Sequence, residues 1–327
     1  MRTREVPFLP DVAFGRRASV SKPARTYQEQ LDLLKSRGMT VPDEPFALHC
    51  LAHLNYYRLS AYRFSFTVPG NPAQFRPGAT FTQLWELYHF DRTLRALVLE
   101  ACKRVEISVR SRLAYEIGHQ LGPLAYLENR HFSDPLEHAR TLTKLDSEMN
   151  RSKETFIKHH KGTLGMPWPP VWVLTEVTSF GNVSKLLAGL QPPALRQSVA
   201  DTYGLDEKTL CSFFHHLTVL RNTAAHHGRL WNRKYIFTIQ LPKKKPPHLF
   251  PNFNHTCTPI GNPNERRIYN SLVLMIHLVQ VIEPDSTLPC RLAHLLASLD
   301  PVLQPEMELP ANWQSLPIWQ PLLSAHP

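Results

Sequence analysis

The part of this sequence best suited to chemistry is the segment from Leu220 to Arg233, LRNTAAHHGRLWNR. Arg221 and Asn222 stand at its start, and four residues separate Arg221 from His226. If the segment is one helix, a rotation of about 100° per residue places these three side chains on one face, together with Arg229. Ala225 lies between them and leaves room for a ligand to approach. His227 points away from this face.

A face of arginine, asparagine and histidine suits the phosphodiester of RNA. Arginine holds a phosphate with two parallel hydrogen bonds and stabilises the charge of a pentacoordinate transition state. Histidine can take a proton from a ribose 2′-hydroxyl or give one to the leaving 5′-oxygen near neutral pH. No acidic cluster that would hold a metal ion stands nearby. The pattern therefore predicts catalytic roles for Arg221, Asn222 and His226, with no metal and no cofactor.

The charge distribution also indicates a polyanionic partner. There are 37 Lys+Arg against 27 Asp+Glu, a formal net charge of +10. Seven basic residues and no acid occur from Arg221 to Lys245, whereas the chain after Val281 is acidic. Such asymmetry concerns partners rather than fold. We expect the following residues to contact RNA: Arg229, Arg233, Lys234, Lys243, Lys244 and Lys245. The three lysines between prolines are equally consistent with a solubilising loop.

The elements that position these residues are predicted to be helices, so the fold class is all-α. Residues 26–37 carry a complete helix signature, with Thr26 as N-cap, Glu29 in a capping box and Gly38 after the end. Apolar residues at three- and four-residue steps predict further helices, at 46–62, 81–117, 136–158, 171–190, 206–227, 264–283 and 288–299. Residues 235–240 fit a short strand or an extended loop.

Cysteine usage and the apolar runs exclude several classes of protein. The five cysteines are widely spaced, which predicts reduced and mostly buried thiols rather than disulfides or a zinc site. The longest apolar run, from Leu272 to Ile282, is too short to span a membrane. The N-terminal residues contain no uninterrupted apolar stretch typical of a secretory signal. We therefore expect a cytoplasmic protein without a membrane partner.

Several blocks of this sequence resemble a known family. The RN, small residues and His226, followed by RLWNR, resemble the RNxxxH form of the signature of HEPN ribonucleases. The chain resembles more specifically the Abi-like family of bacterial abortive-infection proteins, in the AbiD and AbiF group. Collinear blocks carry this likeness: KPARTYQEQLDLLKSRGM, LNYYRLSAYRFSF, ELYHFDRTLRALVLEACKRVEISVRSRLAY and SFGNVSKLL.

The resemblance implies a HEPN-like helical bundle with additional N- and C-terminal helices, and a role in phage defence, often as a toxin. It implies metal-independent RNA cleavage that leaves a 2′,3′-cyclic phosphate. Because the catalytic face in that family usually pairs with a second copy of itself, it also implies a homodimer. The likeness covers residues 22–299, between an N-terminal arm (1–21) and a Pro-rich C-terminal tail (300–327). Glu106 and Arg110 belong to one of its blocks, so they either support the site or form a helix pair.

Other interpretations remain open at this point. The same basic surface would serve a non-catalytic RNA-binding protein that holds a small structured RNA. Arg221, Asn222 and His226 could also cap and pair within a bundle that only binds proteins, since short motifs are hypotheses. Tyr56, Tyr57 and Tyr62 resemble base-stacking residues, but aromatic residues at helical spacing are more often core, and we assign them to the core.

Overall fold

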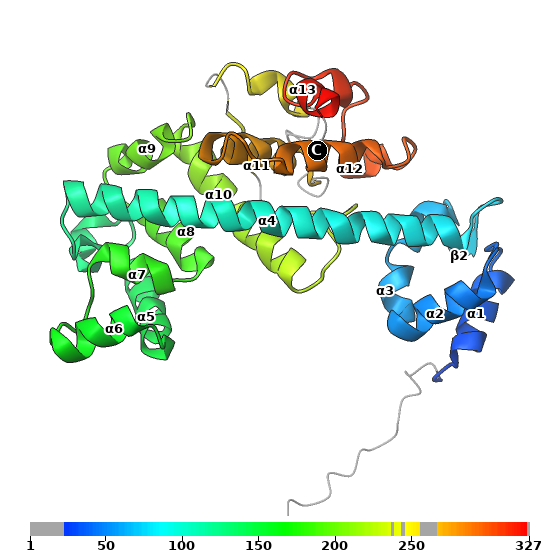
Figure 1. The fold of residues 1–327 in the computed structure, drawn as a ribbon, viewed down its shortest axis with the longest axis horizontal. Coiled ribbons are helices and arrows are strands. Elements are labelled where there is room, and N and C mark those ends of the chain that lie inside the picture. The colour runs from blue at the N-terminus through cyan, green and yellow to red at the C-terminus, as the bar shows by residue number, and fades with distance from the viewer. Residues whose placement is uncertain (1–22, 237–238, 243–245, 256–266, 326–327) are drawn as a thin grey trace, which may run out of the picture. The chain divides into compact units, whose positions relative to one another are not determined.

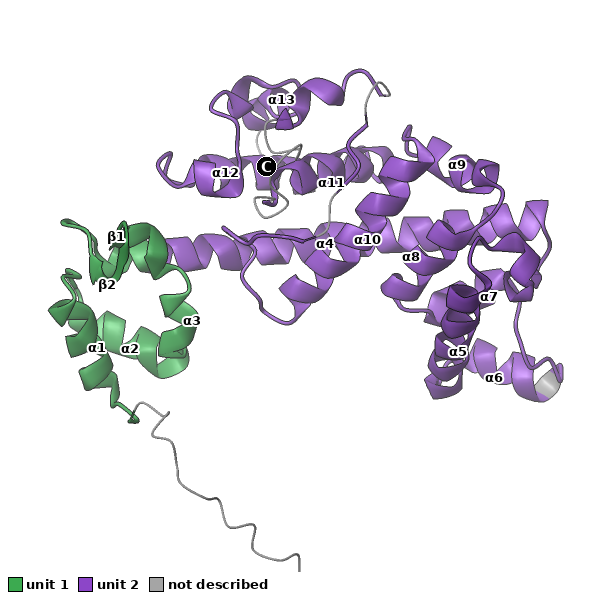
Figure 2. Ribbon diagram, turned by 180° about the vertical axis from the view of Figure 1, so that it is seen from behind, with its two compact units in different colours: residues 1–84 green, residues 85–327 purple. Residues whose placement is uncertain are grey.

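The computed structural model describes residues 23–236, 239–242, 246–255 and 267–325. Within these ranges the chain forms thirteen α-helices, several short 3₁₀ turns and one two-stranded hairpin, which confirms the all-α class (Figure 1). It divides into two compact units, residues 1–84 and 85–327, shown in different colours in Figure 2. The division falls in the first turn of α4 (Phe81–Gln120), where the sequence predicted no boundary. The arm at 1–21 lies outside the described residues, and the ends assigned at 22 and 299 stay predictions.

The smaller unit contains three short helices and the hairpin. Its elements are α1 (Tyr27–Ser36), α2 (Glu44–His53), α3 (Tyr56–Ser60), a 3₁₀ turn at Arg63–Phe66, and the antiparallel strands β1 (Thr67–Val68) and β2 (Asn71–Phe75). The predicted capping box is present, because Thr26 Oγ1 accepts from the Glu29 backbone N–H and the Glu29 carboxylate accepts from that of Thr26. Leu31, Leu51 and Phe75 are among the residues of its core.

The predicted helix 46–62 is in fact two helices. Leu54 adopts an extended conformation after α2, and the Asn55 side chain accepts from the Tyr57 N–H to begin α3. Of the three tyrosines assigned to the core, Tyr62 is only 1% exposed, which confirms its assignment. The assignment of Tyr57 was wrong, because 67% of its surface is exposed. Tyr56 is half-buried, and its hydroxyl accepts from Arg37 Nη1 at 3.1 Å.

The larger unit is organised along α4. The predicted helix 81–117 is one continuous helix, and its buried residues recur at three- and four-residue steps from Leu94 to Ile117. Figures 1 and 2 show α11 (Tyr269–Ile282) and α12 (Leu288–Ala297) along one side of α4, with α5 (Pro135–Arg151), α6 (Thr155–Lys158) and α7 (Val171–Val177) on the other. Ion pairs and hydrogen bonds from α4 reach both sides, including Glu100 to Arg291 on α12 and Arg110 to the Glu176 carbonyl on α7.

Three further helices complete the packing around α4. They are α8 (Phe180–Gly189), α9 (Pro193–Asp201) and α10 (Glu207–Ala225). The predicted helix 171–190 is divided between α7 and α8, because Thr178 adopts an extended conformation and Ser179 begins a new helix. α8 packs against α10, with the rings of Phe180 and Phe214 edge to face at 5.9 Å.

The most buried helix is α11, and the residues after α12 pack beside it. All of its residues from Ser271 to Val279 are buried. Trp313 and Trp319 are 1% and 0% exposed, so they anchor the Pro-rich segment. Trp319 Nε1 donates to the hydroxyl of Tyr269 on α11 at 3.0 Å, and α13 (Gln320–Ser324) packs against α12.

We expect His277 on α11 to make the stability of this unit depend on pH. It is 7% exposed, and its Nε2–H donates to the Tyr203 carbonyl at 2.8 Å. Burial lowers the pKa of His277 below its ordinary value of about 6.5, and His248 lowers it further. Below about pH 6.5 the unfolded chain therefore binds a proton that the folded chain does not, so stability falls as the pH drops. We expect His277→Gln to reduce the loss of unfolding free energy between about pH 7.5 and about pH 5.5, measured by urea denaturation. An equal loss in both proteins would contradict this.

Candidate functional site

The site predicted from sequence lies at the C-terminal end of α10. Asp206 caps the start of this helix, because its carboxylate accepts from the Thr209 N–H at 2.9 Å. Leu210, Phe213, Leu217 and Leu220 form its buried stripe. Arg221 and Asn222 belong to the last helical turns, and His226 is the C-cap residue. Asn222 and His226 are exposed and Arg221 is half-buried, so the three side chains reach the surface from one helix end.

The helix ends two residues earlier than the sequence predicted, and the way it ends matters for the site. His227 adopts a left-handed conformation with φ of 57°. The His227 N–H donates to the Ala224 carbonyl at 3.0 Å and the Gly228 N–H to the Thr223 carbonyl at 2.7 Å. This is a Schellman motif, which satisfies carbonyls that the helix end would leave unpaired. The two neighbouring histidines therefore leave the helix in different directions.

This ending corrects the predicted place of Arg229. The rotation of an ideal helix placed Arg229 on the face of Arg221, but the helix stops at Ala225 and Arg229 lies beyond the turn. The guanidinium of Arg229 instead lies over the ring of the buried Trp231, 5.8 Å from its centroid. Arg233 and Lys234 are exposed, whereas Lys243, Lys244 and Lys245 lie outside the described residues. Residues 235, 236, 239 and 240 are not in a strand, so the described part of 235–240 forms a loop.

Glu106 on α4 connects two arginines at this site. Its Oε1 forms an ion pair with Arg110 one turn along the helix, and its Oε2 lies 3.9 Å from Arg221 Nη2 on α10. Glu106 and Arg110 are 13% and 17% exposed, whereas Arg221 is 40% exposed. Arg221 Nη1 also donates to Asn222 Oδ1 at 3.0 Å. Glu106 and Arg110 thus form a helix pair and also reach Arg221, so the structure brings together both residues predicted to support the site and two of the three predicted as catalytic.

Cys102 lies one helical turn before Glu106 but is not suited to act as a nucleophile. Burial raises the pKa of its thiol to about 12, and the charge of Glu106 raises it as well, while Arg221 opposes them in part. With this pKa, Cys102 stays neutral at physiological pH. Because the thiolate is the reactive form, the neutral thiol is a poor nucleophile. Cys50, Cys102 and Cys290 are buried free thiols and Cys211 is half-buried, as predicted, while Cys257 lies outside the described residues.

A buried ion pair that sequence reasoning missed fixes the chain after the site. Asp91 and Arg95 on α4 are 0% and 5% exposed and form an i, i+4 ion pair. Asp91 Oδ1 also accepts from the backbone N–H groups of Leu230 at 3.0 Å and Trp231 at 2.7 Å. The available signal was an acid and an arginine four residues apart within an otherwise apolar helical stripe. Asp91 thereby holds the RLW segment, which follows directly on the helix end with His226.

Asn232 extends this fixed segment toward the C-terminal part of the chain. The Asn232 carbonyl accepts from Arg267 Nη1 at 2.7 Å, and its side-chain amide contacts both Arg267 and Glu306. Asn232 is half-buried and adopts a left-handed conformation with φ of 50°, which asparagine tolerates better than most residues. Arg233 and Lys234 follow directly, so these two exposed basic side chains extend from a backbone that the contacts of Asn232 hold in place.

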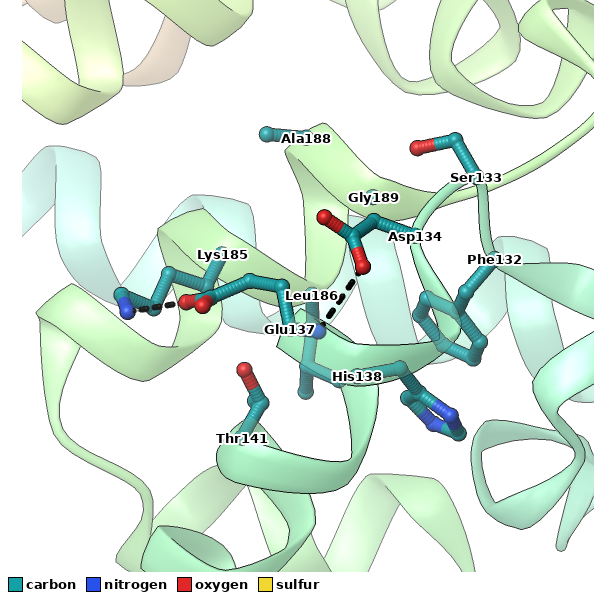
Figure 3. A pocket seen from close by; sticks show the side chains of 10 residues that line it. All are labelled: Phe132, Ser133, Asp134, Glu137, His138, Thr141, Lys185, Leu186, Ala188 and Gly189. Carbon is teal, nitrogen blue, oxygen red and sulfur yellow. Dashed lines mark hydrogen bonds and ion pairs between the residues drawn. The ribbon is translucent and has the colours of Figure 1, made fainter.

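A separate hollow lies between α5 and α8, away from these residues. The cavity has a volume of about 230 Å³, and Figure 3 shows the side chains that line it, among them Glu137 and Lys185, which form an ion pair. Asp134 caps α5 there, accepting from the Glu137 backbone N–H. The hydrogen bond from Lys185 holds the pKa of Glu137 below its ordinary value. Of the residues predicted for catalysis or RNA contact, those that the structure describes do not line this cavity.

The described residues also limit two other kinds of site. They contain no group of three or more histidines, cysteines or carboxylates placed to hold a metal ion. None of the helices that the structure describes is both long and apolar enough to cross a lipid bilayer.

Gly228 gives the helix end a direct stability test. A Cβ atom at Gly228 would lie 2.9 Å from Thr223 Cγ2 and 3.0 Å from the Thr223 carbonyl oxygen, so Gly228→Ala must disturb the last turn of α10. We expect a loss of about 1–3 kcal/mol in unfolding free energy, measured by urea denaturation. The control is Gly181→Ala in α8, where nothing lies within 4 Å of the added atom and helix propensity favours alanine. A Gly228→Ala protein as stable as the wild type would show that the turn adapts without cost.

The comparison with known proteins identifies the family of the chain. A family model described as Abi-like protein matches residues 49–232, more than half of the chain. The matched range includes Glu106, Arg110, Arg221, Asn222 and His226, and it ends just before Arg233. No curated protein matches the chain, and no solved structure does.

Proposed function

This chain belongs to the Abi-like protein family, and we propose that it is a metal-independent endoribonuclease of the HEPN type that acts in antiphage defence, by abortive infection or as a toxin. Family membership itself indicates a role in abortive-infection-type defence. The nuclease activity is our own proposal. The observation that carries it is the C-terminal end of α10, where Arg221 is tied to Glu106 and His226 stands exposed five residues later.

The chemistry we propose is an attack within the RNA chain. The ribose 2′-oxygen bonds to phosphorus while the bond from phosphorus to the 5′-oxygen breaks, which leaves a 2′,3′-cyclic phosphate and a 5′-hydroxyl. An imidazole takes the 2′-hydroxyl proton, and another gives a proton to the 5′-oxygen. Arg221 neutralises the charge that builds on the phosphate oxygens, and Asn222 donates to one of them.

Glu106 has a positioning role in this proposal. It lies beside one edge of the Arg221 guanidinium, 3.9 Å from Nη2, and the N–H groups that neither Glu106 nor Asn222 uses are left for phosphate. Arg110 pairs with the same carboxylate and also donates to the Glu176 carbonyl on α7 at 3.1 Å. Arg110 thus fixes the position of the Glu106 side chain by linking it to α7.

The two imidazoles come from two copies of the chain in this proposal. Each chain has one Arg221/His226 face, and a two-fold axis beside it places two His226 side chains at one phosphate. We therefore propose a homodimer, with RNA held by Arg233 and Lys234 and, outside the described residues, by Lys243 to Lys245. Arg229 is a weaker candidate than the sequence suggested, because its guanidinium lies against Trp231.

The test is cleavage of labelled RNA by the purified protein in the presence of EDTA. We expect cleavage under these conditions, with products that end in 2′,3′-cyclic phosphate and begin with a 5′-hydroxyl. Cleavage that requires a divalent metal, or that leaves a 5′-phosphate, would contradict the proposal.

A second function fits one particular observation. Arg221 is engaged by both Glu106 and Asn222, as it would be in a site that binds RNA without cutting it. In this alternative the protein holds a small structured, non-coding RNA as a partner. Binding of RNA with no cleavage, with or without metal, would favour it.

A further inference from the structure

The smaller unit exposes two aromatic rings on one side of a short helical stretch. Tyr57 is 67% exposed and Phe64 is 54% exposed. The backbone between them is nearly continuous, because α3 is followed by Ala61 and Tyr62 in helical conformation and then by the 3₁₀ turn at Arg63–Phe66. Seven residues make about two helical turns, so the two rings lie on the same side and about 10–14 Å apart along the stretch.

The opposite side of this stretch is core. Leu59, Tyr62 and Phe66 are 2%, 1% and 6% exposed, and they recur at three- and four-residue steps. These three buried side chains are sufficient to pack the stretch against the core of the unit. Packing therefore does not explain why large aromatic residues occupy the exposed positions 57 and 64. Large aromatic rings on the solvent-exposed face of a helical stretch whose other face is buried suggest that a ligand with flat surfaces stacks on them.

Arginines accompany both rings. The guanidinium of Arg63 lies over the ring of Phe64, 5.3 Å from its centroid, and Arg76 donates to the Ser65 carbonyl beside it. Tyr57 packs edge to face against Tyr56 at 5.8 Å, and Arg37 Nη1 donates to the hydroxyl of Tyr56. One guanidinium thus lies over Phe64 itself, and another contacts Tyr56, the residue next to Tyr57.

The charge around the rings is of one sign. Residues 45–85 contain three arginines and no Asp or Glu. The four acids of the described part of this unit lie earlier in the chain and already have intramolecular contacts: Glu29 with Thr26, Asp32 with Gln28, Asp43 with the Phe46 N–H, and Glu44 with Lys35. A surface that interleaves aromatic rings with arginines and lacks acids complements a single-stranded nucleic acid, whose bases stack while its phosphates meet the cations.

We propose that this surface, made of Arg37, Tyr57, Arg63, Phe64 and Arg76, binds single-stranded RNA by stacking bases on Tyr57 and Phe64. It is a binding site in the smaller unit, separate in sequence from the Arg221/His226 face of the larger unit. The inference rests on the proposed function only in taking RNA as the ligand, and it adds that the RNA is unpaired where it is held.

The experiment measures binding of a labelled, unstructured single-stranded RNA to the full chain carrying His226→Ala, which keeps the RNA from being consumed. We expect each of Tyr57→Ala and Phe64→Ala to weaken binding about five- to hundredfold, and Tyr57→Phe to bind as the parent does. Arg63→Gln should lower the slope of log affinity against log salt by about 0.7. The matched control is Tyr27→Ala, a half-exposed tyrosine of the same unit on the acid-bearing helix α1.

A direct readout guards against a variant that folds poorly. Tyr57→Trp keeps a large exposed ring, and its added fluorescence should be quenched when single-stranded RNA binds, but not with the same sequence as a duplex. Unchanged affinity in the two alanine variants, equal weakening in Tyr27→Ala, or no quenching of the added tryptophan would overturn the inference. In the protein with His226 intact, RNA that is bound through Tyr57 but never cut would contradict the nuclease proposal and leave this binding site standing. Normal RNA cleavage by a protein with His226 intact and both Tyr57 and Phe64 replaced by alanine would contradict this binding site and leave the nuclease proposal standing.

Discussion

Replacing His226 with alanine is expected to reduce the rate of RNA cleavage by about two to four orders of magnitude, the usual contribution of a positioned acid or base. His226 is exposed and caps α10 through its backbone N–H, which donates to the Asn222 carbonyl at 3.0 Å. Alanine preserves that bond, so the fold should be little affected. The measurement is single-turnover cleavage of labelled RNA in EDTA, with thermal unfolding of the same preparation.

The adjacent His227 provides the matched control. His227→Asn removes an imidazole one residue away while suiting the left-handed conformation at that position, and we expect cleavage within about threefold of the wild type. If the His226→Ala protein cuts RNA at the wild-type rate, His226 is not the acid or base. Equal losses in both variants would point instead to a shared structural effect.

Replacing Asp91 with alanine should have the largest effect on stability of any single change discussed so far. The substitution leaves the guanidinium of Arg95 buried without its carboxylate and removes the acceptor for two backbone N–H groups, of Leu230 and Trp231. Breaking one side of a buried ion pair costs about 3–5 kcal/mol, and each orphaned N–H adds to it. Because a domain is stable by only about 5–15 kcal/mol, urea denaturation should show a strongly destabilised or unfolded larger unit.

A partly exposed ion pair on the same helix serves for comparison. Glu100 lies one turn before Arg104, and the two side chains are about 30% exposed. Glu100 also pairs with the partly exposed Arg291 on α12. Glu100→Ala should cost about 1 kcal/mol or less, since water replaces much of what is lost. If Asp91→Ala were no more destabilising than Glu100→Ala, the buried pair would not be what holds the RLW segment.

Most of the helices could be predicted from sequence because their signals are local. The capping box at Thr26 and Glu29 and the apolar steps of α4 depend on residues a turn or two apart, and both are present in the structure. The breaks at Leu54 and Thr178 were missed because the apolar pattern continues through them. Asn55 and Ser179 marked the new helix starts, but hydrophobic periodicity alone does not separate one bent helix from two.

Contacts of the candidate site between residues close together on one helix could be predicted from the sequence. Contacts between residues on different helices could not. Glu106 and Arg110 are four residues apart, so their pairing follows from spacing, and the family resemblance connected them with the site. The end of α10 was not readable, because the left-handed residue is His227 rather than the glycine that usually marks this position. The contact of Asp91 with Trp231 joins residues 140 positions apart, which no local pattern announces.

The distance between Asp91 and Glu106 along α4 restricts how this chain can change in evolution. These two carboxylates lie fifteen residues apart on one straight helix, about 22 Å, and they hold opposite ends of the segment from Arg221 to Trp231. Inserting or deleting a single residue between them would rotate one carboxylate by about 100° relative to the other. Insertions and deletions should therefore be excluded from this stretch of α4, whereas side-chain replacements on its exposed face are free to accumulate.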